Sequence, residues 1–326
     1  MRDFGYLNSK IEEHVKGLEE ELDISLEEYI SLMRQIYQIS LRVTKTFDEY
    51  QDVYENNEAE KGISFQETIR IVLKFLNTID SNLVSLFEKT IDSGIILFHT
   101  KKELKNLSIT KDNFYYFYNL AGTYNGKYII NIVLTNTISD IFTIVHEFIH
   151  YVSMSSLDKK SLSWLHFTEG YSLAFEKLLY EFLNKQSKWK EQIQKYYMKV
   201  LYSMHLRNFE FQSEFICLDV FLSSGSFTPQ KVLKYLKEEE NKEVLATRIL
   251  NNARISEKFI LQNEKTLREY LEDSRYVMAM PFSECIIKSI PKEKNDILSD
   301  LYHLEEKTFD YFFNKYDFSD KKLIKS

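Results

Sequence analysis

The sequence predicts a mainly α-helical protein with one small β-sheet, and three observations carry that prediction. The chain holds only 8 glycines and 3 prolines in 326 residues, so it has few helix breakers. Apolar residues recur at helical spacing behind sequence patterns that typically start helices. β-Branched apolar runs, which favour strands, are concentrated within residues 94–134.

Several helix starts are indicated by capping residues. Ser25–Glu28 and Ser64–Glu67 each match a capping box, in which a hydroxyl and a later carboxylate bind free backbone amides. Each should open an amphipathic helix, and the first is expected to run to about Asp48. Thr228-Pro229 predicts a further start, because proline suits the first helical position. The chain is expected to be helical again over about 295–313.

Two segments are predicted to form strands. Gly94–His99 is a short candidate, and Tyr128–Leu134 is a better one because it is β-branched, apolar and preceded by a turn at Asn125-Gly126. The second strand could present a free edge to an extended ligand, or it could be an ordinary internal strand. The sequence leaves both possibilities open.

Composition excludes some classes of protein. Apolar residues make up 44% and charged residues 28%, as in ordinary globular proteins, and the net charge is −7. Basic residues are spread among acidic ones, which argues against a nucleic-acid partner. The chain has no signal core and no run of roughly 18 apolar residues, so we expect a cytoplasmic protein with no membrane partner. Cys217 and Cys285 are expected to be buried, reduced thiols.

The most informative segment is the apolar run Ile141–His150, which reads as a buried helix and contains the pattern His-Glu-x-x-His. Residues four apart share a helix face, so His146 and His150 can point their imidazoles at one metal ion. Glu147 lies one step round the helix, where its carboxylate can reach a metal-bound water. This pattern is typical of zinc peptidases. The alternative is a structural helix whose histidines are ordinary core or surface groups.

Two histidines require a third metal ligand. A metzincin would have a glycine and a third histidine soon after the motif, but Ser153 and Ser156 stand at those positions. The segment Trp164–Glu176 predicts a second helix, and Glu169 near its start is the natural third ligand. His166 is a rival candidate for the same role.

Glu176 follows Glu169 by seven residues and therefore falls on the same face of the predicted helix. It could orient one of the ligand histidines, as groups behind a metal site commonly do. It could equally be a surface carboxylate on an amphipathic helix.

Residues 121–150 resemble the catalytic segment of oligoendopeptidase F, a member of the thimet-oligopeptidase-like zinc metallopeptidases. The shared order is a Gly-Thr-Tyr turn at 122–124, an apolar strand, a helix entry and then the His-Glu-x-x-His motif. Phe167–Glu176 is similar to the ligand helix of that family. The resemblance covers about 63–290, with strong motifs only between 121 and 176.

The resemblance implies a helical zincin-type metallopeptidase with a small β-sheet beside the zinc helix and a substrate cleft. It implies one zinc ion held by His146, His150 and Glu169, with Glu147 as general base, and endopeptidase activity on short peptides. It also implies a division of the chain into an N-terminal helical segment, 1–62, and a catalytic domain, 63–326, behind a polar linker that ends at Gly62.

The sequence also departs from the family pattern. Ile149 replaces the glycine of the family's motif, and most of the large N-terminal lobe is missing. Family members carry a C-terminal His and Tyr that bind substrate and stabilise the oxyanion, but 271–281 holds no matching histidine. Tyr276 is our candidate for the tyrosine, with Tyr270 second. These departures motivate two alternatives: a zinc-containing peptide-binding protein with little turnover, and a metal-free helical scaffold.

Overall fold

The computed structural model describes residues 25–43, 62–100, 120–124, 127–153, 162–185, 187–226, 228–236 and 273–316, together with 9, 243, 246–247, 250 and 318. The chain divides into two compact units. The smaller unit comprises Met1–Phe47 and Ser203–Met278, and the larger comprises Asp48–Tyr202 and Ala279–Ser326. The division at residue 62 that the family resemblance implies stays a prediction, and of the linker before it only Gly62 lies within the described residues.

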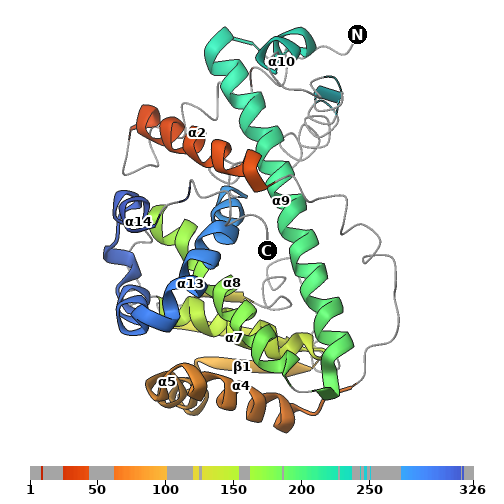
Figure 1. Cartoon of the computed structure of the whole chain (residues 1–326), viewed down its shortest axis with the longest axis vertical. Helices are drawn as coiled ribbons and strands as arrows, with labels where there is room; N and C mark the ends of the chain where they lie inside the picture. The colour runs from red at the N-terminus through yellow and green to blue at the C-terminus, as the bar shows by residue number, and fades with distance from the viewer. Residues whose placement is uncertain are drawn as a thin grey trace. The chain divides into compact units, whose positions relative to one another are not determined.

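The described residues are mainly helical, which confirms the predicted fold class (Figure 1). The larger unit contains α4 (Phe65–Ile79), α5 (Ser81–Asp92), β1 (Ile96–Thr100), β2 (Leu120–Tyr124), β3 (Lys127–Leu134), α7 (Ser139–Val152), α8 (Leu162–Asn184), η3 (Ser187–Trp189), η4 (Leu304–Glu306) and α14 (Phe309–Lys315). The smaller unit contains α2 (Leu26–Val43) and α10 (Pro229–Tyr235). Two long helices, α9 (Lys190–Ser224) and α13 (Ser274–Tyr302), contribute residues to both units.

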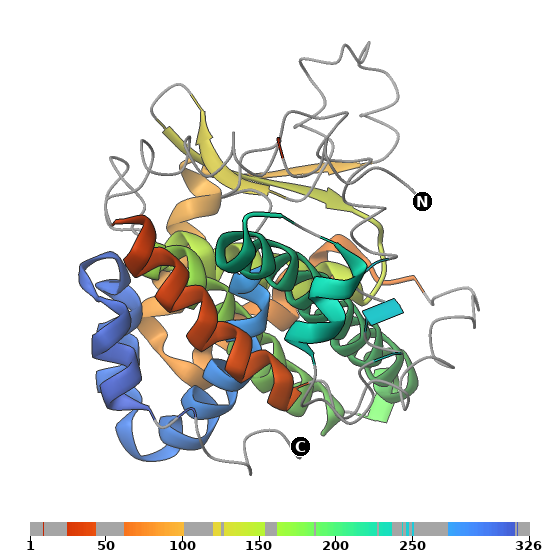
Figure 2. The ribbon, with the colours of Figure 1, turned by 90° about the horizontal axis from the view of Figure 1, so that it is seen from above.

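Within the described residues, the sheet has three strands in the order β1-β3-β2, which Figure 2 shows side by side. β1 runs parallel to β3, and β2 runs antiparallel to it. The predicted strands Gly94–His99 and Tyr128–Leu134 are confirmed as β1 and β3. β3 is the internal strand of the sheet, which decides the question that the sequence left open.

One expectation for this region was wrong. Residues 122–124, expected to form a turn, belong to strand β2, whose Tyr124 is paired with Lys127 and whose Leu120 is paired with Asn131. The strand forms because pairing with β3 gives the backbone groups of this short segment hydrogen-bond partners. The turn predicted at Asn125-Gly126 lies outside the described residues.

The predicted helix starts are present, with one difference. Ser25 and Glu28 form a complete capping box: the Glu28 amide donates to Ser25 Oγ at 3.2 Å, and the Ser25 amide donates to Glu28 Oε2 at 2.8 Å. At the start of α4, Ser64 Oγ accepts from the Glu67 amide at 3.2 Å. The Glu67 carboxylate instead binds Lys188 Nζ at 2.9 Å. Thr228 caps α10, as predicted, whereas residues 44–48 of the first predicted helix lie outside the described part.

The C-terminal helix predicted over 295–313 is interrupted in the structure. α13 ends at Tyr302, the 3₁₀ turn η4 follows, and α14 begins at Phe309. Thr308 starts the new helix by accepting a hydrogen bond from the Tyr311 amide at 3.2 Å. The periodic apolar pattern continues across this break, which is why periodicity alone did not reveal it.

A buried carboxylate fixes the connection from β3 to α7. Asp140, in the first turn of α7, accepts hydrogen bonds from the Thr135 amide at 2.9 Å, the Thr135 hydroxyl at 2.6 Å and the Asn136 amide at 2.8 Å. Asn136 has a φ of 57°, a left-handed conformation that asparagine adopts more readily than most residues. These bonds set where α7 starts relative to the sheet.

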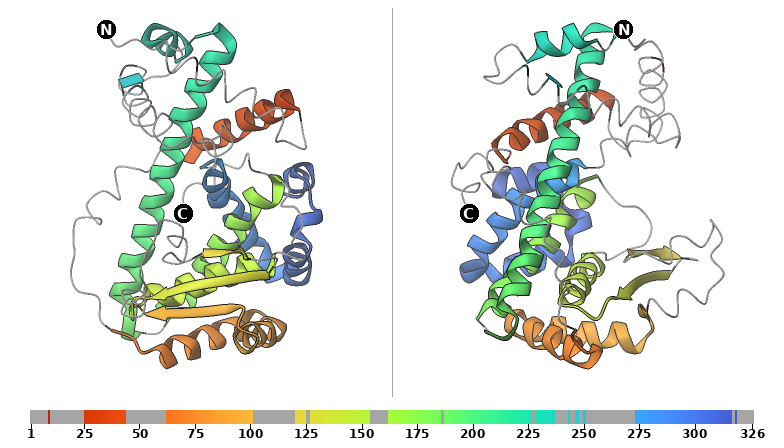
Figure 3. Two further views of the ribbon diagram at one scale, coloured as in Figure 1. Left: turned by 180° about the vertical axis from the view of Figure 1, so that it is seen from behind. Right: turned by 90° about the vertical axis from the view of Figure 1, so that its right-hand side faces the viewer.

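The helix α7 packs against β2, β3, α4 and α8 (Figure 3, right). Its apolar side chains are fully buried; Phe148, for example, meets the ring of Phe87 from α5 edge-on, with ring centroids 5.1 Å apart. Burial of a side chain of this size contributes about 1.5–3 kcal/mol. α7 is therefore a central element of the larger unit, as its apolar sequence predicts.

In the smaller unit, α2 packs against the later part of α9. Tyr37 and Phe215 place their ring centroids 5.3 Å apart, and Arg34 forms an ion pair with the carboxylate of Asp219 at 2.5 Å. Tyr235 of α10 donates a hydrogen bond to the same carboxylate at 2.7 Å. One buried acidic group thus connects three helices of this unit.

Two further expectations from composition can be compared with the structure. Cys217 and Cys285 are both buried thiols outside any disulfide, as predicted. Across the described ranges, no helix combines the length and the apolar character that a membrane crossing requires.

Gly170 of α8 allows α13 to approach closely. A Cβ atom at this position would lie 2.4 Å from Cδ1 and 3.2 Å from Cβ of Phe282, whose ring is fully buried. Only glycine fits such a contact without a shift of the ring or of the helix. Because Gly170 follows Glu169 directly, this contact also helps to set the position of that carboxylate.

We expect Gly170→Ala to destabilise the protein, although alanine is the better helix former by about 1 kcal/mol. Overpacking of a buried site costs about 1–3 kcal/mol, which outweighs that gain. Urea denaturation should show a lower midpoint with an unchanged slope. In a Phe282→Leu background, where the rigid ring is gone, the same change should cost less; an equal cost would refute the steric explanation.

Candidate metal centre

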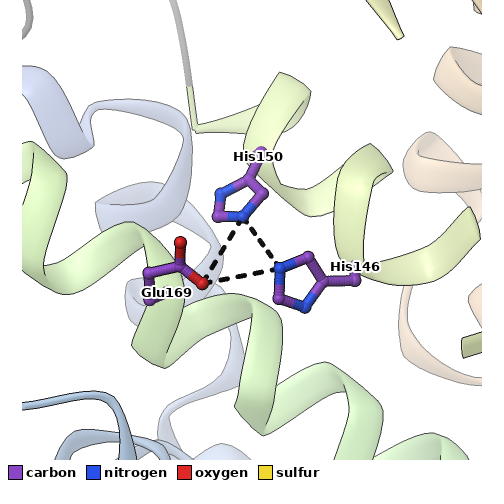
Figure 4. Close-up of side chains that lie close together, drawn as sticks. All are labelled: His146, His150 and Glu169. Carbon is purple, nitrogen blue, oxygen red and sulfur yellow. Dashed lines mark hydrogen bonds and ion pairs between the residues drawn. The ribbon is translucent and has the colours of Figure 1, made fainter. Parts of the chain in front are cut away.

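Three side chains from two adjacent helices converge in the larger unit (Figure 4). His146 and His150 lie one turn apart on α7, and Glu169 comes from α8. The two Nε2 atoms are 3.0 Å apart, and Glu169 Oε2 lies 3.5 Å from Nε2 of His146 and 3.7 Å from Nε2 of His150. His150 and Glu169 are buried, and His146 is half-buried.

The geometry of these three atoms fits a tetrahedral metal ion. Bonds of about 2.0–2.1 Å from zinc to nitrogen and oxygen imply ligand atoms about 3.3–3.4 Å apart. The distances of 3.0, 3.5 and 3.7 Å lie on both sides of this value. Two imidazoles and one carboxylate are also a usual zinc donor set. His146, His150 and Glu169 could therefore hold a metal ion without a large rearrangement.

The other ring nitrogen of each histidine has a partner on α8. Nδ1 of His146 donates to Glu176 Oε1 at 2.5 Å, because a carboxylate accepts the hydrogen. Nδ1 of His150 lies 2.8 Å from the hydroxyl oxygen of Thr168. Glu176 is buried, so the interpretation of this residue as a group that orients a ligand histidine is supported and the surface alternative is wrong.

The two carboxylates also determine the charge of His146. Burial by itself would lower the pKa of this imidazole, but hydrogen bonds to Glu169 and Glu176 and the charges of both groups raise the pKa well above its ordinary value. The imidazole therefore holds a proton readily when no metal ion is bound. A metal ion that binds to Nε2 must displace this proton, so binding is coupled to pH.

Further hydrogen bonds join α7 and α8. Ser172 Oγ donates to the backbone carbonyl of His146 at 3.1 Å, and Trp164 Nε1 donates to that of Ser153 at 3.0 Å. Thr168, Ser172 and Glu176 lie four residues apart and form a polar stripe on the face of α8 that meets α7. All three are buried. The stripe holds α8 in register with α7 around the candidate metal centre.

The other residues singled out in the sequence have different surroundings. Glu147 follows His146 on α7 and is half-buried. His166 is buried and packs edge-on against Phe309, with ring centroids 5.1 Å apart. It does not belong to the group of possible ligands, which favours Glu169 over His166 as the third ligand.

Tyr276 lies in the smaller unit, near the start of α13. The guanidinium of Arg207 sits 4.0 Å from the centroid of its ring, and Arg275 donates a hydrogen bond to its hydroxyl at 3.1 Å. Arg207 in turn binds the Asp273 carboxylate at 2.9 Å. A catalytic role for Tyr276 stays a prediction.

Sequence reasoning assigned no role to Thr168, Ser172 or Ser153. The signal was nevertheless present, because polar residues at spacings of three and four within the otherwise apolar Trp164–Glu176 indicate a polar contact with another buried element. Their partners could not be identified, since this requires the register between α7 and α8.

Comparison with known proteins adds one structural relationship. No known protein family and no curated protein sequence matches this chain. Its structure is similar to the crystal structure of a protein from Chlamydophila abortus that is named as a candidate peptidase, with a TM-score of 0.61 and 16% sequence identity. The likeness covers 98% of this chain but 58% of the other, so this chain spans less than two thirds of that protein. What the two proteins share is the fold.

We expect Glu176→Gln to weaken zinc binding by about 10-fold or more, the usual effect of changing a group that orients a metal ligand. The amide keeps the size of the side chain but loses the charge that favours the imidazole Nδ1–H. Competition with a chromogenic chelator would measure the change. Glu181→Gln, at an exposed position of the same helix, is the control. Equal zinc affinity in the two variants would contradict the role of Glu176.

Proposed function

We propose that this protein is a zinc-dependent metallopeptidase that hydrolyses peptide bonds in short peptides. The observation that carries the proposal is the convergence of His146, His150 and Glu169 at distances suited to tetrahedral zinc, with Glu147 next to the first ligand. Two histidines, one carboxylate and an adjacent glutamate are the set that zinc peptidases of this motif use.

The similarity to the Chlamydophila abortus structure supports a peptidase over other uses of the same metal ligands, since that protein is named as a candidate peptidase. The sequence resemblance between 121 and 176 supports a closer relationship to the oligoendopeptidase F type. We propose this relationship for the segment around the metal centre, with a cleft for the substrate beside it.

The proposed chemistry assigns a role to each group. When bound, zinc supplies Lewis acidity, which makes a nearby water more acidic and polarises the peptide carbonyl. The Glu147 carboxylate takes a proton from the attacking water as the new carbon–oxygen bond forms. It then gives this proton to the amine nitrogen as the carbon–nitrogen bond breaks. Glu176 holds His146 in place throughout, and the family resemblance assigns the oxyanion-stabilising role to a C-terminal tyrosine, for which Tyr276 is the candidate.

A zinc-containing peptide-binding protein with little turnover is the second candidate function. Its support is the environment of Tyr276, whose hydroxyl already accepts a hydrogen bond from Arg275 and whose ring is stacked under Arg207. The absence of a histidine from 271–281 points the same way. Such a protein would bind peptides and zinc but release the peptides intact.

We expect Glu147→Gln to abolish peptide cleavage while zinc remains bound at full occupancy. Loss of a general base typically costs about 100- to 10,000-fold in rate. Mass spectrometry of a peptide mixture would report cleavage, and elemental analysis would report zinc. Glu88→Gln, an exposed position on α5, should change neither.

Each outcome of this experiment separates the candidates. Cleavage by the wild type and none by Glu147→Gln supports the peptidase. Intact peptides after incubation with zinc-loaded wild type support the binding protein. Wild type without stoichiometric zinc indicates the metal-free scaffold, and equal cleavage by Glu147→Gln and wild type refutes the assigned mechanism.

Tyr276→Phe tests the proposed oxyanion group. Loss of one oxyanion donor costs about 100- to 1000-fold in kcat, so we expect a fall of this size with a smaller change in KM and unchanged zinc content. Steady-state kinetics on a cleaved peptide would measure both constants, with Tyr270→Phe as the comparison variant. If kcat is unchanged for Tyr276→Phe, the role of this residue is structural.

A further inference from the structure

Three buried residues form a closed chain of hydrogen bonds behind one metal ligand. The Ser153 hydroxyl lies 2.8 Å from the backbone carbonyl oxygen of His150 and 2.9 Å from the Thr168 hydroxyl. The Thr168 hydroxyl lies 2.8 Å from Nδ1 of His150. The chain thus begins and ends at the same histidine, and it joins the end of α7 to α8.

The direction of every bond in this chain follows from donor and acceptor chemistry. A carbonyl oxygen only accepts, so Ser153 must use its single hydroxyl hydrogen there. The contact between Ser153 and Thr168 then requires Thr168 to donate. Since the hydroxyl hydrogen of Thr168 is already used in this bond, the Thr168 oxygen accepts a hydrogen bond from His150, which places the ring hydrogen on Nδ1.

We propose that Thr168 and Ser153 are positioning residues that select the tautomer of His150, an inference that rests on the proposed metal site. With the hydrogen on Nδ1, the lone pair lies on Nε2, the atom that faces Glu169 and His146. The opposite tautomer would point a hydrogen at the metal position and prevent coordination by Nε2.

The geometry favours Thr168 over the other nearby hydroxyl. Ser172 Oγ lies 3.5 Å from Nδ1 of His150, against 2.8 Å for Thr168, and it already donates to the carbonyl of His146. Thr168 and Ser153 are only 2% and 0% exposed. Water therefore does not compete for these groups, and bonds in such a setting are stronger than at the surface.

The two ligand histidines are consequently oriented by different chemical groups, a carboxylate and a hydroxyl. Nδ1 of His146 faces an anion, Glu176, which both orients the ring and makes it more basic. Nδ1 of His150 faces a neutral hydroxyl, which orients the ring without adding charge. Removal of the Thr168 hydroxyl should therefore change zinc binding through tautomer and ring orientation alone.

Thr168→Val keeps the shape of the side chain and removes the acceptor. We expect zinc affinity, measured by chelator competition with zinc alone, to fall about 10- to 100-fold. Thr168→Ser restores the hydroxyl and should bind zinc within a few-fold of wild type. Thr90→Val is the matched control, because Thr90 is equally buried and its hydroxyl donates to the Phe87 carbonyl at 2.6 Å in α5.

A double-mutant cycle tests whether the two hydroxyls act as one chain. Ser153→Ala leaves Thr168 free to donate to His150, so we expect a smaller loss of zinc affinity. The double variant should bind zinc no more weakly than Thr168→Val alone, because the chain is already broken. Ser283→Ala is the control for Ser153→Ala, since Ser283 is also buried and donates to the Met280 carbonyl at 2.8 Å.

Failure of this inference can be distinguished from failure of the proposed function. If wild type binds no zinc, the proposed function is wrong. If wild type and Thr168→Val bind zinc equally, the positioning role of Thr168 is wrong. If the losses in the double variant are additive, Ser153 does not act through Thr168, and its part in the proposal is wrong. Nitrogen-15 spectra of the metal-free protein give a readout independent of zinc: His150 should carry its hydrogen on Nδ1 in wild type and in Thr168→Ser, and a mixture should appear in Thr168→Val. Circular dichroism of each variant verifies that it is folded.

Discussion

The candidate metal centre places one electrostatic constraint on the larger unit, the close approach of three electron-rich atoms at a largely buried position. Two imidazole nitrogens and a carboxylate oxygen lie within 3.0–3.7 Å of one another, where only a cation or a proton between them relieves the repulsion. The chain holds them there by bonding α7 to α8 at several points, from Trp164 at one end to Glu176 at the other. The close packing of Gly170 against Phe282 serves the same end, because it fixes the helix that carries Glu169.

Removal of these polar side chains from water destabilises the folded state, and hydrogen bonds to the surrounding polar groups offset that cost. Each buried polar group without a hydrogen-bond partner destabilises the folded protein by about 1–3 kcal/mol. Thr168, Ser172 and Ser153 each have a bonded partner across the helix pair, so the polar stripe adds specificity to the contact between α7 and α8. An entirely apolar contact would define the register between the two helices less strictly.

Much of this arrangement could be predicted from the sequence, because the strongest signals are local. The spacing of His146 and His150 and the positions of Glu169 and Glu176 follow from the helical repeat alone. The misassigned features depend on other parts of the chain. β2 is a strand because β3 lies beside it, and the break before Phe309 depends on a cap that periodicity does not reveal. The hydroxyl chain behind His150 escaped notice because Ser153 and Thr168 meet only when two helices pack in one particular register.

The hydrogen bonds of Asp140 in the first turn of α7 bear on whether the position of this helix depends on a metal ion. Asp140 ties the end of β3 to the first turn of α7 through bonds that involve no metal. His146 follows Asp140 by six residues, which is about 9 Å along a helix, so its distance from the sheet is set by the backbone. In small zinc domains the ion itself organises the fold. Here the start of α7 is fixed to the sheet by bonds that need no ion, so loss of a metal ion from His146 and His150 would leave this part of the scaffold held in place.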